Sequence, residues 1–351
     1  MKKILALVFI FVMVFTMVGC APKAEAPAPA PAKESAQASA PEQAAPEAKK
    51  VDFPKRPIEM VIPFGTGGAS DIFARGYAQI VEKYLGKPLT AVNKGGAGTI
   101  EGLTYAYGAP ADGYTVLEIT PSLLIVEAQG KSSIKFRSEF EPIMRVQSDV
   151  VSIGVSVNSQ FQNIDELIEY AKANPKKLKI GGLSPGGLDD YIANGFALAA
   201  GIEWTYVPYK SGSELKAAVL GGELDVYQDK LISFLPLVES GDVRPLVVLN
   251  DKKLDSVEVL KDVPSSVEKG IDFTQGSWRG FVIKKGVPEE VKKIIIEAFE
   301  EAYKDQAYKE MEAREMTNVR EGYLNSEDFG KAWDKEFDSY VEIFKLMGVI
   351  K

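Results

Sequence analysis

The chain has 351 residues, with 41 Lys and Arg against 49 Asp and Glu, no histidine and one cysteine, and its net charge is −8. This length is sufficient for two domains with ample cores. The acidic balance argues against nucleic acid or anionic lipid as a partner. The lack of histidine excludes His-ligated zinc and Ser-His-Asp or Cys-His catalysis, and a single cysteine cannot form an internal disulfide. We therefore expect neither a metal nor a cofactor.

The N-terminus has the pattern of a lipoprotein signal. Lys2 and Lys3 precede an apolar stretch, residues 4–18, which is shorter than the ~20 residues of a membrane-spanning helix. The sequence MVGC at 17–20 resembles a bacterial lipobox, in which the cysteine carries the lipid. We expect residues 1–19 to be a signal peptide and Cys20 to be lipidated. The alternative is a plain signal peptide, or a buried helix with a free thiol.

Residues 20–50 are predicted to be a tether. More than half of this segment is Ala and Pro, and it has no aromatic residue. Such a composition cannot bury enough apolar surface to order itself. The folded part is therefore expected to begin at about residue 51.

The most informative stretch follows. An apolar strand, 58–62, ends in a Gly-rich loop, 63–68, and a helical pattern continues from Ser70-Asp71 to Tyr84. A second strand, 90–92, leads into another Gly-rich loop, 94–99, which again opens a helix. Backbone N–H groups at a helix start are free to bind an anion. Two such loops on neighbouring strands therefore predict an anion site that needs no charged side chain.

Short apolar strands alternate with helical segments along the rest of the chain, which predicts parallel α/β sheets covered by helices. The expected strands are 115–119, 150–157, 178–180, 203–207, 226–227, 245–249 and 280–283. The expected helices are 163–173, 188–200, 214–221, 233–240, 288–314 and 326–347.

Several motifs occur in the order found in one family. They are PFGTGGASDIFAR (63–75), GAGTIEG (96–102), PADGYT (110–115), VPYK (207–210), GGELDV (221–226), SGDVRPLVV (240–248) and WRGFVIKKGVPEEV (278–291). Together they resemble the extracytoplasmic substrate-binding proteins of tripartite tricarboxylate transporters, the Bug family, from residue 57 to about 313. The resemblance implies a two-lobed periplasmic-binding-protein-like (type II) α/β fold. Lobe 1 would comprise 51–147 and 251–351, lobe 2 would comprise 148–250, and the ligand would lie between them.

In this reading the first loop holds a ligand carboxylate. We expect Phe64, Thr66, Gly67, Gly68 and Ser70 at the site, with Asp71 as either a helix cap or a ligand contact. The loop nearly matches a dinucleotide-binding pattern, but a serine stands in the place of the third glycine. A tight turn that needs glycine only for its backbone conformation is the plainer alternative.

The second loop, 182–186, spells G-x-S-x-G, which is typical of a hydrolase nucleophile. Without histidine, Ser184 has no base of the usual kind. We expect this loop to mirror the first one, with Ser184, Gly186 and Gly187 presenting donors at the start of the next helix. Asp189 and Asp190 follow. Either both cap the helix and face solvent, or one of them contacts a cationic or hydroxyl group of the ligand.

Three further positions complete the expected site. Ser122 follows a strand and is expected to place its hydroxyl in the cleft, and Asp229 is expected to bridge the lobes, although Gln228 and Lys230 replace the usual Phe and Asn around it. Lys210 and Trp278 are expected to shape a loop and the core rather than contact the ligand.

The resemblance implies a lipid-anchored, monomeric, non-enzymatic receptor. It would capture a small carboxylate (a di- or tricarboxylate, an acidic amino acid or an aromatic acid) and deliver it to membrane permease subunits by hinge closure. Two alternatives stay open at this point. One is a protein that presents its ligand to a histidine-kinase sensor, and the other is an extracytoplasmic hydrolase that uses Ser184.

Overall fold

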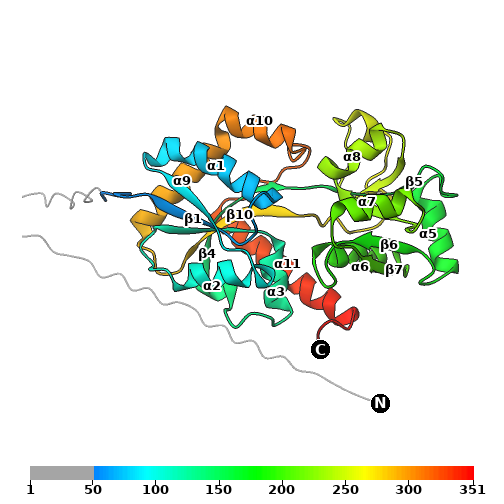
Figure 1. Ribbon diagram of the computed structural model, residues 1–351, viewed down its shortest axis with the longest axis horizontal. Helices are drawn as coiled ribbons and strands as arrows, with labels where there is room; N and C mark the ends of the chain where they lie inside the picture. Colours follow the sequence, from blue (N-terminus) through cyan, green and yellow to red (C-terminus); the bar gives the residue numbers. More distant parts are fainter. Residues whose placement is uncertain (1–50) are drawn as a thin grey trace, which may run out of the picture. The chain divides into compact units, whose positions relative to one another are not determined.

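The computed structural model describes residues 51–351 (Figure 1). The predicted signal peptide, Cys20 and the Ala/Pro-rich tether lie outside the described residues. Within residues 51–351 no helix is both long and apolar enough to cross a membrane.

The first lobe is built on a five-stranded sheet with the order β2-β1-β3-β10-β4. Its strands are β1 (Ile58–Ile62), β2 (Leu89–Asn93), β3 (Thr115–Ile119), β4 (Phe140–Ser148) and β10 (Trp278–Lys284). β1 pairs in parallel with β2 and β3, whereas β10 runs antiparallel to β3 and β4. Strand residues alternate between two cores, because Met60 packs on one face of the sheet and Val61 on the other.

Helices cover both faces of this sheet (Figure 1). One core includes residues of α1 (Ala69–Leu85), α9 (Glu289–Lys304) and α10 (Gln306–Arg314). The other includes residues of α2 (Ile100–Gly108), α3 (Pro121–Ala128), α4 (Phe136–Glu139) and α11 (Ser326–Leu346). The sequence predicted α9 and α10 as one helix. They are separate because the Asp305 carboxylate accepts the Ala307 N–H at 2.8 Å and caps a new helix start.

The second lobe contains two smaller sheets. One has the order β8-β5-β9 and the other pairs β6 with β7. The strands are β5 (Val151–Ser156), β6 (Lys179–Gly182), β7 (Thr205–Pro208), β8 (Tyr227–Lys230) and β9 (Val243–Val248). The helices are α5 (Ile164–Ala173), α6 (Leu188–Ala200), α7 (Gly212–Leu220) and α8 (Leu231–Glu239). Short 3₁₀ turns occur at η1 (Ala97–Thr99), between β2 and α2 of the first lobe, and at η2 (Glu258–Leu260) and η3 (Val267–Lys269), between β9 and β10.

The two-lobed α/β class is confirmed, but the strand directions are mixed rather than mostly parallel. β4 ends at Ser148 and the chain passes directly into β5 of the second lobe. The chain returns to the first lobe at Trp278. Because β10 therefore starts at the edge of the sheet where β3 and β4 end, it runs antiparallel to both. In the second lobe, β5 pairs antiparallel with both β8 and β9.

Helix α11 connects the lobes. At its start the Ser326 hydroxyl donates to the Pro142 carbonyl of β4 at 2.7 Å. Near its end, Ser339 and Tyr191 of α6 share a 2.8 Å hydrogen bond, and Tyr191 packs edge-on against Tyr340. The C-terminal helix therefore packs against both halves of the molecule.

Candidate functional site

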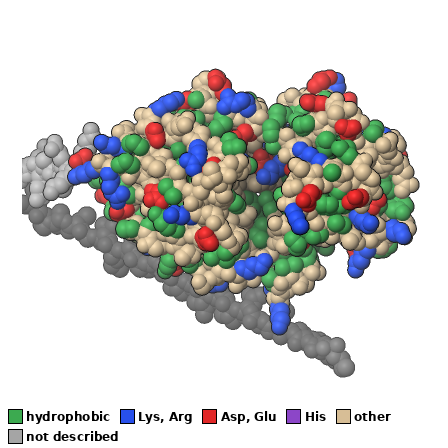
Figure 2. Space-filling model, viewed as in Figure 1, with side chains coloured by type: hydrophobic (Ala, Val, Ile, Leu, Met, Phe, Trp, Pro, Cys, Tyr) green, Lys and Arg blue, Asp and Glu red, His purple; other side chains and the backbone are tan. Residues whose placement is uncertain are grey.

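The surface is hollowed between the two lobes (Figure 2), where two cavities adjoin. The first has a volume of about 600 Å³ and the second about 540 Å³. Residues of both lobes line each cavity, and Phe64, Ser122, Ser184 and Leu188 are among those that line both. We call them the first and second cavity.

Helix α1 starts at the first cavity without a side-chain cap. Its N-cap is Gly68, with φ −78° and ψ 170°, and no side chain of the described part of the chain caps it. Gly68, Ala69 and Ser70 line the cavity. Because the first N–H groups of a helix have no partner within the helix, this start presents donors and a partial positive charge to the cavity.

Helix α6 repeats this arrangement from the other lobe. Its N-cap is Gly187, with φ −88° and ψ −169°, again without a side-chain cap, and Gly187, Leu188 and Asp189 line the first cavity. The preceding glycines are also equivalent, since Gly67 and Gly186 have φ values of 79° and 66°. By contrast, asparagine or serine side chains cap α5, α7 and α11. The predicted mirror relation of the two loops is thus present in the structure.

The same geometry corrects which N–H groups are available. Gly67 N–H donates to the Asp71 carboxylate at 2.8 Å, and Gly186 N–H donates to Asp190 at 2.7 Å. Gly187 N–H donates to the Ser184 carbonyl at 2.9 Å. These three N–H groups were expected to face the ligand, but each closes its own loop instead. The donors left for a ligand are the first-turn N–H groups of α1 and α6.

Asp71 and Asp190 act inside their loops. Asp71 is buried and also accepts hydrogen bonds from Arg75 at 2.7 Å and Asn93 at 2.9 Å. Its pKa is lowered, mainly because Gly67 N–H donates to the carboxylate. Asp190 is buried as well, rather than facing solvent, and burial raises its pKa despite the Gly186 and Asn194 hydrogen bonds. Neither carboxylate lines a cavity.

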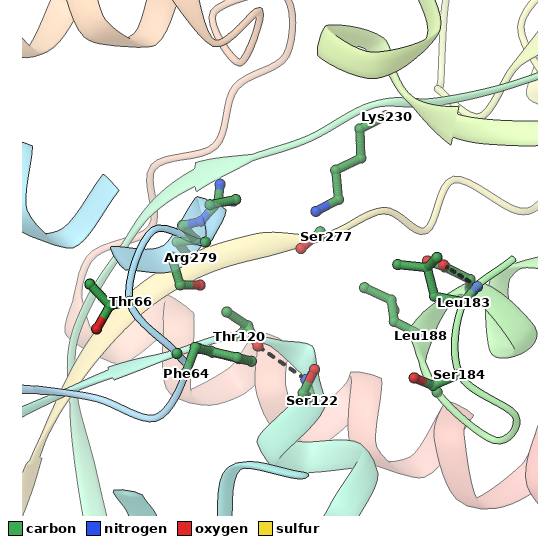
Figure 3. A pocket seen from close by; sticks show the side chains of 16 residues that line it. Phe64, Thr66, Thr120, Ser122, Leu183, Ser184, Leu188, Lys230, Ser277 and Arg279 are labelled. Atoms are coloured by element: carbon green, nitrogen blue, oxygen red, sulfur yellow. Dashed lines mark hydrogen bonds between the residues drawn. The ribbon is translucent and has the colours of Figure 1, made fainter. Parts of the chain in front are cut away.

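Most of the other expected residues lie at the cavities. Phe64, Thr66, Ser122 and Ser184 line both, while Asp189 lines the first and also accepts the Leu183 N–H at 2.9 Å. Thr120 caps α3 by accepting the Ser122 N–H at 3.3 Å (Figure 3).

Asp229 does not reach either cavity. Its two carboxylate oxygens accept the Tyr227 hydroxyl at 2.9 Å and the Lys230 N–H at 2.8 Å, so it stays within its own lobe instead of bridging the two. Lys210 is exposed away from both cavities. Trp278 is buried, and its indole N–H donates to Glu336 at 2.6 Å, as expected of a core residue.

Sequence reasoning missed two cations in the first cavity. Arg279, at the start of β10, and Lys230, at the end of β8, extend toward this space from opposite lobes (Figure 3). Asp149, in the crossover between the lobes, lies 3.7 Å from the Lys230 ammonium and 3.9 Å from the Arg279 guanidinium. Both contacts are loose. Arg279 is only 5% exposed and its Nε has no partner among the described residues, so it retains hydrogen-bonding capacity for an anion.

A buried carboxyl lies behind this cavity. Glu118 of β3 is 0% exposed, and neither of its oxygens has a hydrogen-bond partner among the described residues. Burial raises the pKa of Glu118 to about 8, although Arg279 and Ser70 oppose the shift. Glu118 is therefore mostly protonated at neutral pH and does not cancel the charge of Arg279.

The charges around the first cavity favour one anionic group. Arg279 and Lys230 are balanced by Asp149 and Asp189. The starts of α1 and α6 then add roughly half a positive charge each. The result is a locally positive space in an acidic protein. The described residues contain no cluster of acidic or cysteine side chains suited to a metal ion.

Comparison with known proteins identifies the family. The model of the tripartite tricarboxylate transporter family receptor matches residues 73–345, which is more than half of the chain. The chain belongs to this family. A relative encoded in the gbd 5' region of Cupriavidus necator is 29% identical over 307 residues, which cover 87% of this chain and 91% of that protein.

Solved structures agree on the fold. A TctC solute-binding protein from Polaromonas has a TM-score of 0.74 at 24% identity, covering 84% of this chain and 99% of its own. The periplasmic binding protein BugD has a TM-score of 0.63 at 27% identity, covering 85% and 100%. An R. palustris protein solved with adipate has a TM-score of 0.68 at 23% identity, covering 85% and 99%.

The family match confirms the resemblance inferred from the sequence motifs. The receptor is a solute-binding protein and not an enzyme. Ser184 of the G-x-S-x-G loop lines both cavities, and a solute-binding role requires no catalytic base for it.

Proposed function

We propose that this receptor binds a small carboxylate between its lobes, outside the cytoplasmic membrane, and delivers it to the permease subunits of a tripartite tricarboxylate-type transporter. A lipid on Cys20 would hold it at the membrane, and the Ala/Pro-rich segment would act as the tether. Binding between the lobes favours the closed arrangement, which the permease then recognises.

The observation that carries the proposal is Arg279, whose Nε has no partner within residues 51–351, in a cavity where two uncapped helices begin. An arginine pairs with a carboxylate through charge-assisted hydrogen bonds, and helix starts add further donors. The family match and the adipate held by a protein of the same fold support the same ligand chemistry.

Mass spectrometry under native conditions tests the proposal. Purified full-length protein is measured before and after mild unfolding, and the released compound is identified. Titration calorimetry with that compound then compares wild type with Arg279→Gln. Because a buried guanidinium–carboxylate pair is removed, affinity is expected to fall at least about tenfold.

Lys210→Gln is the matched control, because it removes one exposed positive charge outside both cavities. Its affinity should match wild type. An Arg279→Gln variant that folds and binds the compound as tightly as wild type contradicts the proposed site. A compound without an acidic group contradicts the proposed ligand class.

A further inference from the structure

The second cavity has its own polar end, which lies in the loop after β2. Gly96, Gly98 and Thr99 line this cavity together with Lys131. The loop packs closely on the first one, since a Cβ at Gly95 would lie 2.8 Å from the backbone of Phe64 and Gly65. The two Gly-rich loops of neighbouring strands β1 and β2 are thus in direct contact.

Thr99 holds an unusual conformation at this end. It is the N-cap of α2 with φ 86°, and Ala97 also has a positive φ of 45°. Positive φ is unfavourable for a β-branched residue. A threonine N-cap normally accepts a first-turn N–H with its hydroxyl. Thr99 makes no such bond.

The Thr99 hydroxyl is buried without a partner. Thr99 is 4% exposed, and its Oγ1 forms no hydrogen bond among the described residues. A buried hydroxyl without a hydrogen-bond partner is unfavourable, because it loses its bonds to water and gains none in the protein. Thr99, the N-cap of α2, lines the second cavity, so its hydroxyl is a donor available to an anionic acceptor there.

The charges around the second cavity also favour an anionic group. Lys131 follows helix α3, is exposed, and forms no ion pair within residues 51–351. No acidic residue lines this cavity. An opposing charge, Glu101, lies in the first turn of α2, and its carboxylate occupies the space that a Cβ at Gly96 would take. Glu101 therefore weakens this end without occupying the cavity.

Apolar side chains separate the two polar ends. Phe64 and Leu188 line both cavities, and Ile125 and Val126 line the second. A ligand that spans the cavities would thus place methylene groups against these side chains and polar groups at either end.

We infer that Thr99, Lys131 and the start of α2 form a distal subsite, which takes the second carboxylate of an unbranched dicarboxylate whose first carboxylate is held at Arg279. This inference rests on the proposed function and narrows its ligand class. It assigns ligand contacts to the loop after β2.

Titration calorimetry with two matched series of probes tests the subsite. The unbranched α,ω-dicarboxylates from malonate to suberate are compared with monocarboxylates of the same chain length. At the best chain length, wild type is expected to bind the dicarboxylate at least about tenfold more tightly, as for one gained charge-assisted hydrogen bond.

Two variants should reduce that preference. Thr99→Val keeps the shape and β-branching but removes the hydroxyl, and Lys131→Gln removes the charge. Each is expected to weaken dicarboxylate binding severalfold and to leave monocarboxylate binding unchanged. Glu101→Gln should strengthen dicarboxylate binding. Lys135→Gln is the matched control, because Lys135 is exposed nearby but lines neither cavity. Circular dichroism checks that each variant folds. If Thr99→Val does not fold, the dicarboxylate preference of Lys131→Gln alone tests the subsite.

The outcomes separate the two proposals. If dicarboxylates bind no better than their monocarboxylate partners, or if Thr99→Val and Lys131→Gln leave the preference intact, the distal subsite is wrong while carboxylate binding stands. If neither series binds and native mass spectrometry finds no acidic compound, both the subsite and the proposed function fail.

Discussion

The side-chain amide of Gln129 donates a 2.6 Å hydrogen bond to the backbone carbonyl of Gly186. Gln129 is the C-cap of α3 in the first lobe, and Gly186 belongs to the loop before α6 in the second lobe. Both residues line the second cavity. The bond therefore joins the lobes directly beside the candidate site.

Gln129→Ala should favour separation of the lobes. One hydrogen bond contributes about 1 kcal/mol, so we expect ligand affinity to fall roughly fivefold. Small-angle scattering of the ligand-free variant should show a larger radius of gyration. Gln306→Ala is the control, because Gln306 of α10 is exposed and lies outside both cavities. Wild-type affinity together with wild-type scattering in Gln129→Ala would show that this contact has no part in closure.

Gly68→Ser should separate stability from binding. Gly68 has an N-cap conformation, and a Cβ there meets only the Gly65 carbonyl oxygen, at 3.5 Å. A serine hydroxyl in this position accepts a first-turn N–H and supplies the missing cap. We expect the unfolding midpoint to be kept or slightly raised, while ligand affinity falls at least about tenfold because those donors are now occupied.

Gly67→Ser should have the opposite effect on stability from Gly68→Ser. Gly67 has φ 79°, so Gly67→Ser strains the backbone and is expected to lower the unfolding midpoint by a few degrees. Thermal unfolding and calorimetry on both variants check the pair. Unchanged affinity in a well-folded Gly68→Ser would show that the start of α1 does not contact the ligand.

Glu118 should make stability and binding depend on pH. The pKa of Glu118 in the folded protein is about 8, above its ordinary value of 4.5. Between these values the folded state binds more protons than the unfolded state, so the stability contributed by Glu118 is complete below pH ~4.5 and is lost as pH rises toward ~8. Glu118→Gln should flatten this decline, which urea unfolding at several pH values measures.

Ligand binding should change over the upper part of the same range. When Glu118 ionises, its charge opposes a ligand carboxylate and competes for Arg279. We expect the wild-type affinity to fall above about pH 8, and the affinity of Glu118→Gln to stay level. Parallel pH profiles for the two proteins would mean that another group controls the change.

Cys20→Ala tests the proposed anchor. Since Cys20 is the only thiol in the chain and ends a lipobox-like run, this variant should leave the membrane fraction and fail to incorporate labelled palmitate. Fractionation with immunodetection measures the first effect. Retention of the variant in membranes at the wild-type level would contradict attachment through this residue.

The sequence alone determined those features that depend on neighbouring residues. The strand Ile58–Ile62, its Gly-rich loop and the following helix were predicted closely, because apolar periodicity and glycine act within a few residues. Helix Leu188–Ala200 and the likeness of its loop to the first one followed for the same reason. These local signals also carried the family resemblance.

The tertiary structure decided which groups face the cavity. Arg279 reaches it because the chain returns from the second lobe and starts β10 there, a long-range event that strand patterns do not encode. Glu118 has its raised pKa because the packing around β3 removes it from water. Gly67 N–H is unavailable because Asp71, one helical turn away, is held at 2.8 Å from it. The sequence thus specified the two helix starts, whereas folding placed the cations between them and selected the free donors.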